Sequence, residues 1–386
     1  MQARRRGSAL LWLIPPEILL HVFELYVLVT RSSPYSSERP WPLKLKNDEL
    51  AALPLTHVCR HWRSIAVDHG PLWTTIPFDL VRSFWHDELL ARSKTFAITV
   101  KITDPHARHR AKAPPCILQQ ARESGVLLAH IHHVKSLSLA GPYEDVASVA
   151  ESITRGAPCL KNLQVNVKSY IDGGQSEDGH IPLSGEFARG TPQLRGIALK
   201  FCWIPWESPI FTGLTSLSIL LRTNPFREAP LDSLLQCIER LPSLKELSLV
   251  ECIPYGRDLG IHEPILLPSL VALTVGGEAR ICAALLHYLD LPACLHLSWT
   301  SPHDCEFIPF LPVIVSHCLR ASEAGKPAHT LEVADDCDAL FRIESWDSTP
   351  FSPGNSPDGL PRPQLRIELE WDHDLVHGIV AEFPRV

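Results

Sequence analysis

The sequence lacks the short motifs that mark the common catalytic and cofactor-binding sites. It has no glycine-rich phosphate loop of the GxGxxG or GxxxxGK[ST] type, no GxSxG nucleophile elbow and no HExxH zinc motif. Its eleven cysteines include no CxxC pair, so zinc ribbons and thioredoxin-like redox sites lose their usual signature. We therefore expect no cofactor, no metal site and no enzymatic activity of its own.

An excess of positive charge is also missing. The 386 residues carry 36 Lys and Arg against 43 Asp and Glu, a formal net charge of −7. Nucleic-acid-binding domains are as a rule basic, so we expect no nucleic-acid partner. The chain has no N-x-[ST] glycosylation site, and its cysteines are scattered. Both features favour reduced thiols and an intracellular protein, in the cytoplasm, the nucleus or both.

The N-terminal region has no uninterrupted hydrophobic run long enough for a membrane span. Residues 9–29 are largely apolar, and a signal peptide or anchor is the alternative. Two prolines interrupt the run at Pro15 and Pro16, and Glu17 and Glu24 lie within it, where a mid-membrane carboxylate would be costly. We therefore expect no membrane contact and predict a soluble helix. Its broad apolar face comprises Ile18, Leu19, Val22, Phe23 and Tyr26.

A second amphipathic helix is predicted to begin near Leu55. Gly70 and Pro71 provide the stop signal for it. Its apolar stripe at helical spacing comprises Leu55, Val58, Cys59, Trp62, Ile65 and Ala66. Two such helices cannot bury all of each other's apolar side chains, so we expect this small unit to pack against another surface.

These two segments together resemble an F-box. The segment from Ile14 to Phe23, IPPEILLHVF, is similar to the F-box opening Leu-Pro-x-Glu-Ile-Leu-x-x-Ile-Phe. The segment VCRHWRSIA from Val58 to Ala66, followed by Leu72 and Trp73, is similar to its closing half. The inserted loop, residues 31–54, is similar in style to the large F-box families of mushroom-forming fungi.

The resemblance implies a partner. F-box domains bind the adaptor subunit Skp1 and, through it, the cullin of an SCF-type ubiquitin ligase. Carried over by motif position, the Skp1-docking residues are Ile14, Pro15, Glu17, Ile18, Leu19, Val22, Phe23, Val58 and Trp62. The alternative is that these apolar residues form only an internal core.

The rest of the chain contains a repeated pattern, L-x-x-L-x-L with Val and Ile allowed. Successive copies are 26, 34, 20, 30 and 26 residues apart, most of them near the period of leucine-rich repeats. The copies begin at Val134, Leu160, Leu194, Leu214, Leu244 and Leu270. Cys202 and Cys252 occupy the consensus Asn or Cys position, eight residues after the first Leu of their copies. Helices are predicted between the strands, over residues 146–153, 231–241, 281–289 and 310–319.

The predicted fold is α/β: a small all-α F-box-like domain followed by an irregular leucine-rich-repeat solenoid of parallel strands and helices. The alternative for the second part is an ordinary α/β domain with a mostly parallel sheet. The expected divisions of the chain are an N-terminal tail at 1–12, the F-box-like domain at 13–76, a connector with the first strand at 77–114 and the repeat array at 115–386. The end of the array is acidic, with 12 Asp and Glu against 4 Arg after residue 329.

The outward positions of the repeat strands form the predicted target-binding face. Few of them are charged, which excludes a groove that binds many phosphates, since such a groove would need many cations, and suits a protein partner, or no partner on that face. The residues proposed for target contact are Asn162, Gln164, Asn166, Lys200, Ser216, Ser218, Glu246 and Ser248. The predicted function is a substrate-recognition subunit that binds Skp1 and recruits an unknown protein target. The alternative is a non-catalytic leucine-rich-repeat module whose F-box engages no ligase.

Two histidine-containing clusters could suggest metal binding. One comprises His57, Cys59 and His61, and we expect Cys59 to lie on a different helix face from the two histidines. The other comprises His130, His132 and His133, which have no cysteine or carboxylate at ligand spacing. We expect neither cluster to hold a metal.

Overall fold

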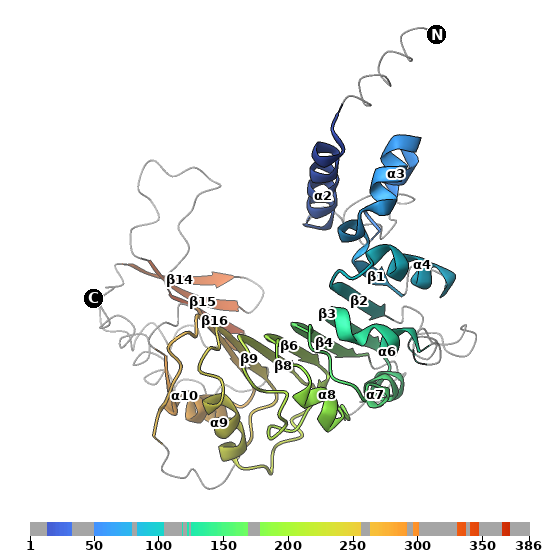
Figure 1. The fold of residues 1–386 in the computed structure, drawn as a ribbon. Coiled ribbons are helices and arrows are strands. Elements are labelled where there is room, and N and C mark those ends of the chain that lie inside the picture. The colour runs from blue at the N-terminus through green and yellow to red at the C-terminus, as the bar shows by residue number, and fades with distance from the viewer. Residues whose placement is uncertain are drawn as a thin grey trace, which may run out of the picture. The chain divides into compact units, whose positions relative to one another are not determined.

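The structure is a computed structural model (Figure 1). It describes residues 14–32, 50–78, 83–103, 118, 122, 125–168, 178–255 and 263–291, and the backbone of four later strands at 296–300, 330–336, 340–346 and 365–370. The chain divides into two compact units. Unit 1 is Met1–Leu163 with Gly190–Pro192, and unit 2 is Gln164–Arg189 with Gln193–Val386.

Unit 1 begins with two helices and two short 3-10 turns: α2 (Pro16–Ser32), η2 (Pro54–His57), α3 (Arg60–Asp68) and η3 (Gly70–Trp73). Pro16 is the first residue of α2, where a missing N–H costs nothing. The Sγ of Cys59 caps α3 by accepting the backbone N–H of Trp62 at 3.4 Å. Phe23 of α2 packs against Trp62 with ring centroids 4.9 Å apart, so the two helices share a core.

The helical part of unit 1 is joined to its first strands by packing. Strand β1 (Thr75–Pro77) follows η3 directly, and helix α4 (Ser83–Ser93) and strand β2 (Ile98–Thr103) come next. The guanidinium of Arg92 lies 4.7 Å above the ring of Trp73, and the Trp73 Nε1–H donates to the Ala66 carbonyl at 2.8 Å. The segment after residue 76 therefore packs against the F-box-like helices in addition to connecting them to the strands.

The remainder of unit 1 completes a three-stranded parallel arrangement. It contains α6 (Val126–His130), η5 (Ile131–His133), β3 (Val134–Gly141) and α7 (Tyr143–Ser152). Strand β2 lies between β1 and β3 and is parallel to both. Helix α7 buries Val146, Ala147, Val149 and Ala150, as its predicted apolar pattern requires.

The strands of unit 2 lie side by side in the order β4, β6, β8, β9, β11, β13, β16, β15 and β14. Adjacent strands from β6 to β16 are parallel. Their bounds are β4 (Asn162–Val167, which contains the boundary between the units), β6 (Gly196–Lys200), β8 (Ser216–Leu220), β9 (Glu246–Val250), β11 (Ala272–Gly276), β13 (His296–Thr300) and β16 (Leu365–Glu370).

The motif copies are in register across these parallel strands. The second apolar residue of each copy pairs with its equivalent, in the row Ile197, Leu217, Leu247 and Leu273, and Leu297 of β13 continues this row outside the motif copies. The members of this row from β6 to β11 are buried, and the residues on either side of each face outward. A parallel sheet with alternating burial is what the repeated pattern predicts.

The last strands are not all parallel to their neighbours and do not follow one another in chain order. Strand β14 (Thr330–Asp336) pairs antiparallel with β15 (Leu340–Trp346), and β15 pairs antiparallel with β16. Only residues 337–339 separate β14 from β15, too few for the crossover that a parallel pair needs. The C-terminal region is thus a mixed α/β region built on a mostly parallel sheet.

Helices α8 (Gly185–Arg189), α9 (Leu231–Glu239) and α10 (Ala279–His287) lie along one side of the unit 2 strands (Figure 1). Helix α9 buries the stripe that its sequence predicts: Leu231, Leu234, Leu235 and Ile238. Four two-residue strands complete the unit: β5 (Gly179–His180), β7 (Cys202–Trp203), β10 (Ile265–Leu266) and β12 (Leu289–Asp290). The helix expected at 310–319 lies outside the described residues.

Two copies of the sequence motif share a detailed local geometry. The residue after β6, Phe201, and the residue after β9, Glu251, both have left-handed backbone angles, with φ of 59° and 56°. Each is followed by a buried cysteine whose thiol donates to a carbonyl on an earlier strand. The Sγ of Cys202 lies 3.7 Å from the Val165 oxygen, and the Sγ of Cys252 lies 3.8 Å from the Ile219 oxygen. Phe201 and Glu251 differ in side chain, so what the two copies share is the backbone conformation of this position and the cysteine that follows it.

Candidate functional site

Helix α2 has two apolar faces. Leu19, Phe23 and Val27, spaced four residues apart, form the inner face and are almost completely buried. A second set is exposed, with between 42% and 66% of each residue accessible. We call this set the α2 stripe: Ile18, Val22, Leu25, Tyr26 and Val29. Its spacing of four, seven, eight and eleven residues from Ile18 places all five on one side of the helix.

The α2 stripe is a costly surface to leave in water. Full burial of a Val, Leu or Ile side chain contributes roughly 1.5–3 kcal/mol relative to exposure. Four such residues and Tyr26 on one side of a helix are more than the scattered apolar residues found on ordinary surfaces, and contiguous patches of this kind mark sites of protein contact. The inner face of α2 is already packed against α3, so the stripe is surplus to the core of the F-box-like region.

The predicted docking residues fall on both faces. Pro15, Glu17, Ile18, Val22 and Val58 are exposed. The rest are buried or half-buried: Leu19 and Phe23 are core residues, and Ile14 and Trp62 are half-buried. The sequence pattern counted one broad face because the positions of Leu19 and Phe23 adjoin those of Ile18 and Val22 around the helix. The predicted docking set did not include the stripe residues Leu25, Tyr26 and Val29, although their spacing from Ile18 is a signal that could have found them.

Polar contacts hold α2 in place beside α3. The Nε2 of His69, the residue that follows α3, lies 2.7 Å from the Oε1 of Glu24. This pair is partly exposed, so it orients the helix more than it stabilises the fold. The Nε–H of Arg63 donates to the Thr56 carbonyl at 2.7 Å and ties α3 to the turn that precedes it.

The structure places the predicted target-binding residues on the strands as expected, at outward positions. Asn162, Gln164, Lys200 and Glu246 are exposed; Asn166, Ser216, Ser218 and Ser248 are half-buried. Register brings some of them together. Ser216 is opposite Glu246 and its hydroxyl donates to the Oε2 at 3.0 Å, while Ser218 is opposite Ser248. The result is a small-residue, nearly neutral face from β6 to β9.

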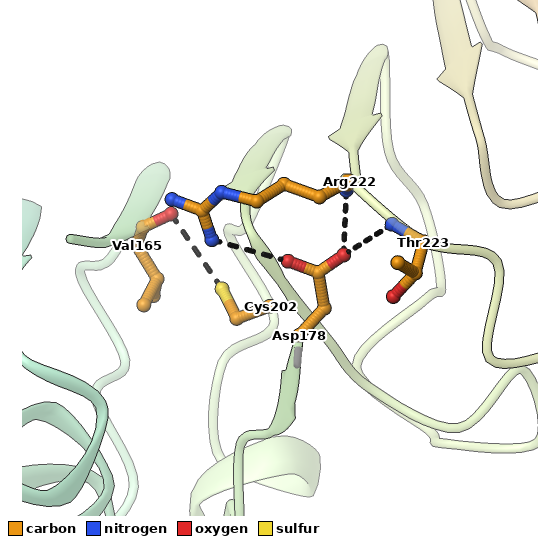
Figure 2. A network of polar contacts seen from close by, with 5 residues as sticks. All are labelled: Val165, Asp178, Cys202, Arg222 and Thr223. Atoms are coloured by element: carbon orange, nitrogen blue, oxygen red, sulfur yellow. Dashed lines mark hydrogen bonds and ion pairs between the residues drawn. The ribbon is translucent and has the colours of Figure 1, made fainter. Parts of the chain in front are cut away.

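A network of polar contacts lies just beyond the carboxyl ends of β6 and β8 (Figure 2). The side chain of Asp178 is 1% exposed and its Oδ2 accepts the backbone N–H groups of Arg222 and Thr223, at 2.5 Å and 2.9 Å. Its Oδ1 lies 3.4 Å from Nη1 of Arg222. The Arg222 guanidinium also lies 3.5 Å above the ring of Phe201. Sequence reasoning missed this network because Asp178 and Arg222 are distant in the chain and belong to no motif.

The four thiols that the structure describes in unit 2 are structural. Burial raises the pKa of Cys202 to about 12 and that of Cys237 to about 11. Burial also raises the pKa values of Cys252 and Cys282. A protonated thiol is a poor nucleophile and a poor metal ligand, so these groups act as apolar packing residues.

The histidine cluster of unit 1 is compact. His133 Nδ1 lies 3.1 Å from His132 Nε2, and the ring of His130 is 5.1 Å from that of His133. Burial, together with the charge of His132, lowers the pKa values of His130 and His133. Within the described residues, no group of three or more His, Cys, Asp or Glu side chains is arranged to hold a metal ion. In that same part of the chain, no helix is both long enough and apolar enough to cross a membrane.

Comparison with known proteins identifies the helical part of unit 1. Residues 11–78 match the F-box-like family model, and they form an F-box-like domain. The matched range covers the predicted F-box segments, from Ile14 through Trp73, so that prediction is confirmed. A comparison with curated proteins found no match to this chain.

Proposed function

We propose that this protein is the substrate-recognition subunit of an SCF-type ubiquitin ligase, and that the α2 stripe binds Skp1. The observation that carries the proposal is the division of α2 into a buried face and an exposed apolar face within an F-box-like domain. Because the inner face completes the domain's own core, the outer face is available to a partner.

The proposed role involves no bond chemistry by this chain. By binding Skp1 and a target at once, the protein raises the effective concentration of the target beside the ubiquitin-transfer machinery on the cullin. The burial and protonation of the thiols described in unit 2 agree with a non-catalytic role. The proposed location is intracellular, in the cytoplasm, the nucleus or both, where Skp1 and cullins act.

Target recognition is assigned to the α/β region, as a degenerate leucine-rich-repeat array. Two observations support this assignment: the in-register rows of motif leucines, and the shared left-handed residue plus buried cysteine after β6 and β9. The long segment between the two F-box helices supports a relation to the F-box families of mushroom-forming fungi. The competing function is a repeat module whose F-box-like domain engages no ligase.

The test compares two substitutions on one helix. In Val22→Asp a carboxylate enters the α2 stripe at a position that is 47% exposed. In Leu28→Asp it enters an exposed apolar position of the same helix, 60% accessible, about a third of a turn away from Val22 and outside the stripe. Co-expression of Skp1 with the wild-type chain and with Leu28→Asp should yield a soluble complex, and with Val22→Asp it should not. Far-ultraviolet circular dichroism checks that both variants fold.

Two results would overturn the proposal. If Val22→Asp binds Skp1 as well as the wild type does, the α2 stripe is not the docking surface. If affinity purification recovers Skp1 without a cullin, the competing function is correct. Leu19→Asp is unsuitable as a probe, because it places a charge in the core and would remove binding by unfolding the domain.

A further inference from the structure

Two cationic side chains converge on one aromatic ring at the carboxyl edge of the unit 2 sheet. Lys200 is the last residue of β6 and Phe201 follows it. The Nζ of Lys200 lies 5.1 Å from the centre of the Phe201 ring, and Cζ of Arg222 lies 3.5 Å from the same centre. The carboxyl edge of a parallel sheet is where open α/β folds commonly bind ligands.

The arginine of this cluster is held in place before any ligand arrives. Asp178 accepts its backbone N–H and pairs with Nη1, and Phe201 supports the face of its guanidinium (Figure 2). A guanidinium has five N–H donors, and the described contacts of its side chain use one of them. The side chain is 30% exposed, so the outer edge can donate two parallel hydrogen bonds to an acid.

The aromatic ring that both cations approach belongs to a residue with an uncommon backbone conformation. Phe201 has a φ of 59°, in the left-handed region that residues other than glycine rarely adopt. The residue after β9, Glu251, has the same left-handed conformation, so this conformation belongs to the turn that both copies share. After β6 the turn carries an aromatic side chain that is only half-buried and can contact a ligand.

Charge at the cluster favours an anion. Lys200 and Arg222 are opposed by the single buried carboxylate of Asp178, which leaves one positive charge in excess. Next to Lys200, the backbone register places Leu220 and then Val250, both half-buried and outward. An acidic group bound at the cations would therefore have room for an apolar neighbour within about three residues along an extended peptide.

We propose that Lys200, Phe201 and Arg222 form a binding site for an acidic peptide segment, whose carboxylate or phosphate group is bound by the two cations. This proposal deepens the proposed function and rests on it, because the peptide belongs to the target that the ligase subunit recruits. A nucleic acid is disfavoured, since the outward face from β6 to β9 carries Lys200 as its one cation and the chain is acidic overall.

The test uses oriented peptide libraries with degenerate flanks and one fixed central residue. The fixed residue is Glu, phosphoserine, Gln or Lys, and binding to the full-length protein is measured by fluorescence anisotropy. We expect the Glu or the phosphoserine library to bind at least tenfold more tightly than the Gln library. The arm that binds identifies which anion the site takes. Equal binding of the acidic and Gln libraries would refute the proposal.

Variants locate the site. Lys200→Glu should lower the affinity for the acidic library at least tenfold, and Arg222→Lys should lower it severalfold because the planar fork is lost. Lys245→Glu makes the same charge change at an exposed position beyond the amino end of β9, and it should leave binding unchanged. Equal losses of affinity in Lys200→Glu and Lys245→Glu would overturn the assignment. It would also be overturned if a single-stranded oligonucleotide bound more tightly than the acidic peptides and Lys200→Glu abolished that binding.

The same titration on Val22→Asp separates the two proposals. If Skp1 binding is lost and peptide binding remains, each surface acts as assigned. If the wild type binds the peptide but not Skp1, only the ligase function fails. If it binds Skp1 but shows no preference for the acidic libraries, only the peptide site fails.

Discussion

Removal of the Asp178 carboxylate should open the loop that follows β8. In Asp178→Ala the backbone N–H groups of Arg222 and Thr223 lose their acceptor, and each hydrogen bond to a charged group contributes about 1.5–3 kcal/mol. The contact with the Arg222 side chain is longer, at 3.4 Å, and partly exposed, so it adds little. We expect a local destabilisation of roughly 3 kcal/mol, equivalent to about a hundredfold change in the opening equilibrium.

Hydrogen–deuterium exchange measures this effect directly. The amides of Arg222 and Thr223 should exchange at least tenfold faster in Asp178→Ala than in the wild type, while amides in α9 keep their protection. Glu239→Ala removes an exposed carboxylate from α9 and should leave the loop unchanged. Equal protection of the two amides in Asp178→Ala would show that the buried carboxylate does not order this loop, and the pre-positioning of Arg222 would lose its basis.

Three further outcomes follow from burial and charge. Phe23→Ala should destabilise the F-box-like domain by about 3–5 kcal/mol, seen as a lower urea midpoint, and an unchanged midpoint would contradict its place in the core. The lowered pKa values of His130 and His133 mean that the unfolded state binds more protons, so stability should be complete above about pH 6.5 and fall on acidification below it. Replacing both histidines with Gln should flatten that fall between pH 7.5 and 5.5, and an unchanged slope would refute this assignment. Cys202 should resist iodoacetamide at pH 8 while half-buried Cys59 reacts, and mass spectrometry showing equal labelling would contradict the buried, protonated thiol.

Local patterns predicted much of the fold. The proline-containing opening and the spacing of the apolar residues around Trp62 were enough to recognise an F-box-like domain, because helix starts and stripes are encoded within a few residues. The repeated leucine motif predicted the parallel strands in the same way, since alternate residues of a strand share a face. The antiparallel hairpin of β14 and β15 had no such signal, because pairing partners are not specified by the period of a strand.

The surfaces were predicted less completely. For α2, the pattern could not separate Leu19 from Ile18, because both are apolar and adjacent on the helix. Their burial depends on which side α3 packs, and the contact of Phe23 with Trp62 determines that side. The cluster of Lys200, Phe201 and Arg222 was also beyond sequence reasoning, since two residues come from the end of one strand and the third from beyond the next.

The order of residues alone determined the chemical character of this protein: an acidic chain without cofactor motifs, with an F-box-like beginning and a leucine-rich remainder. The tertiary structure decided which apolar residues remained exposed to solvent and which charged side chains formed pairs. The spacing of apolar side chains is a local property, because one or two helical turns, or a single strand, are enough to reveal it. Exposure of the α2 stripe and the meeting of Arg222 with Asp178 depend on contacts between segments far apart in the chain, and only packing brings those segments together.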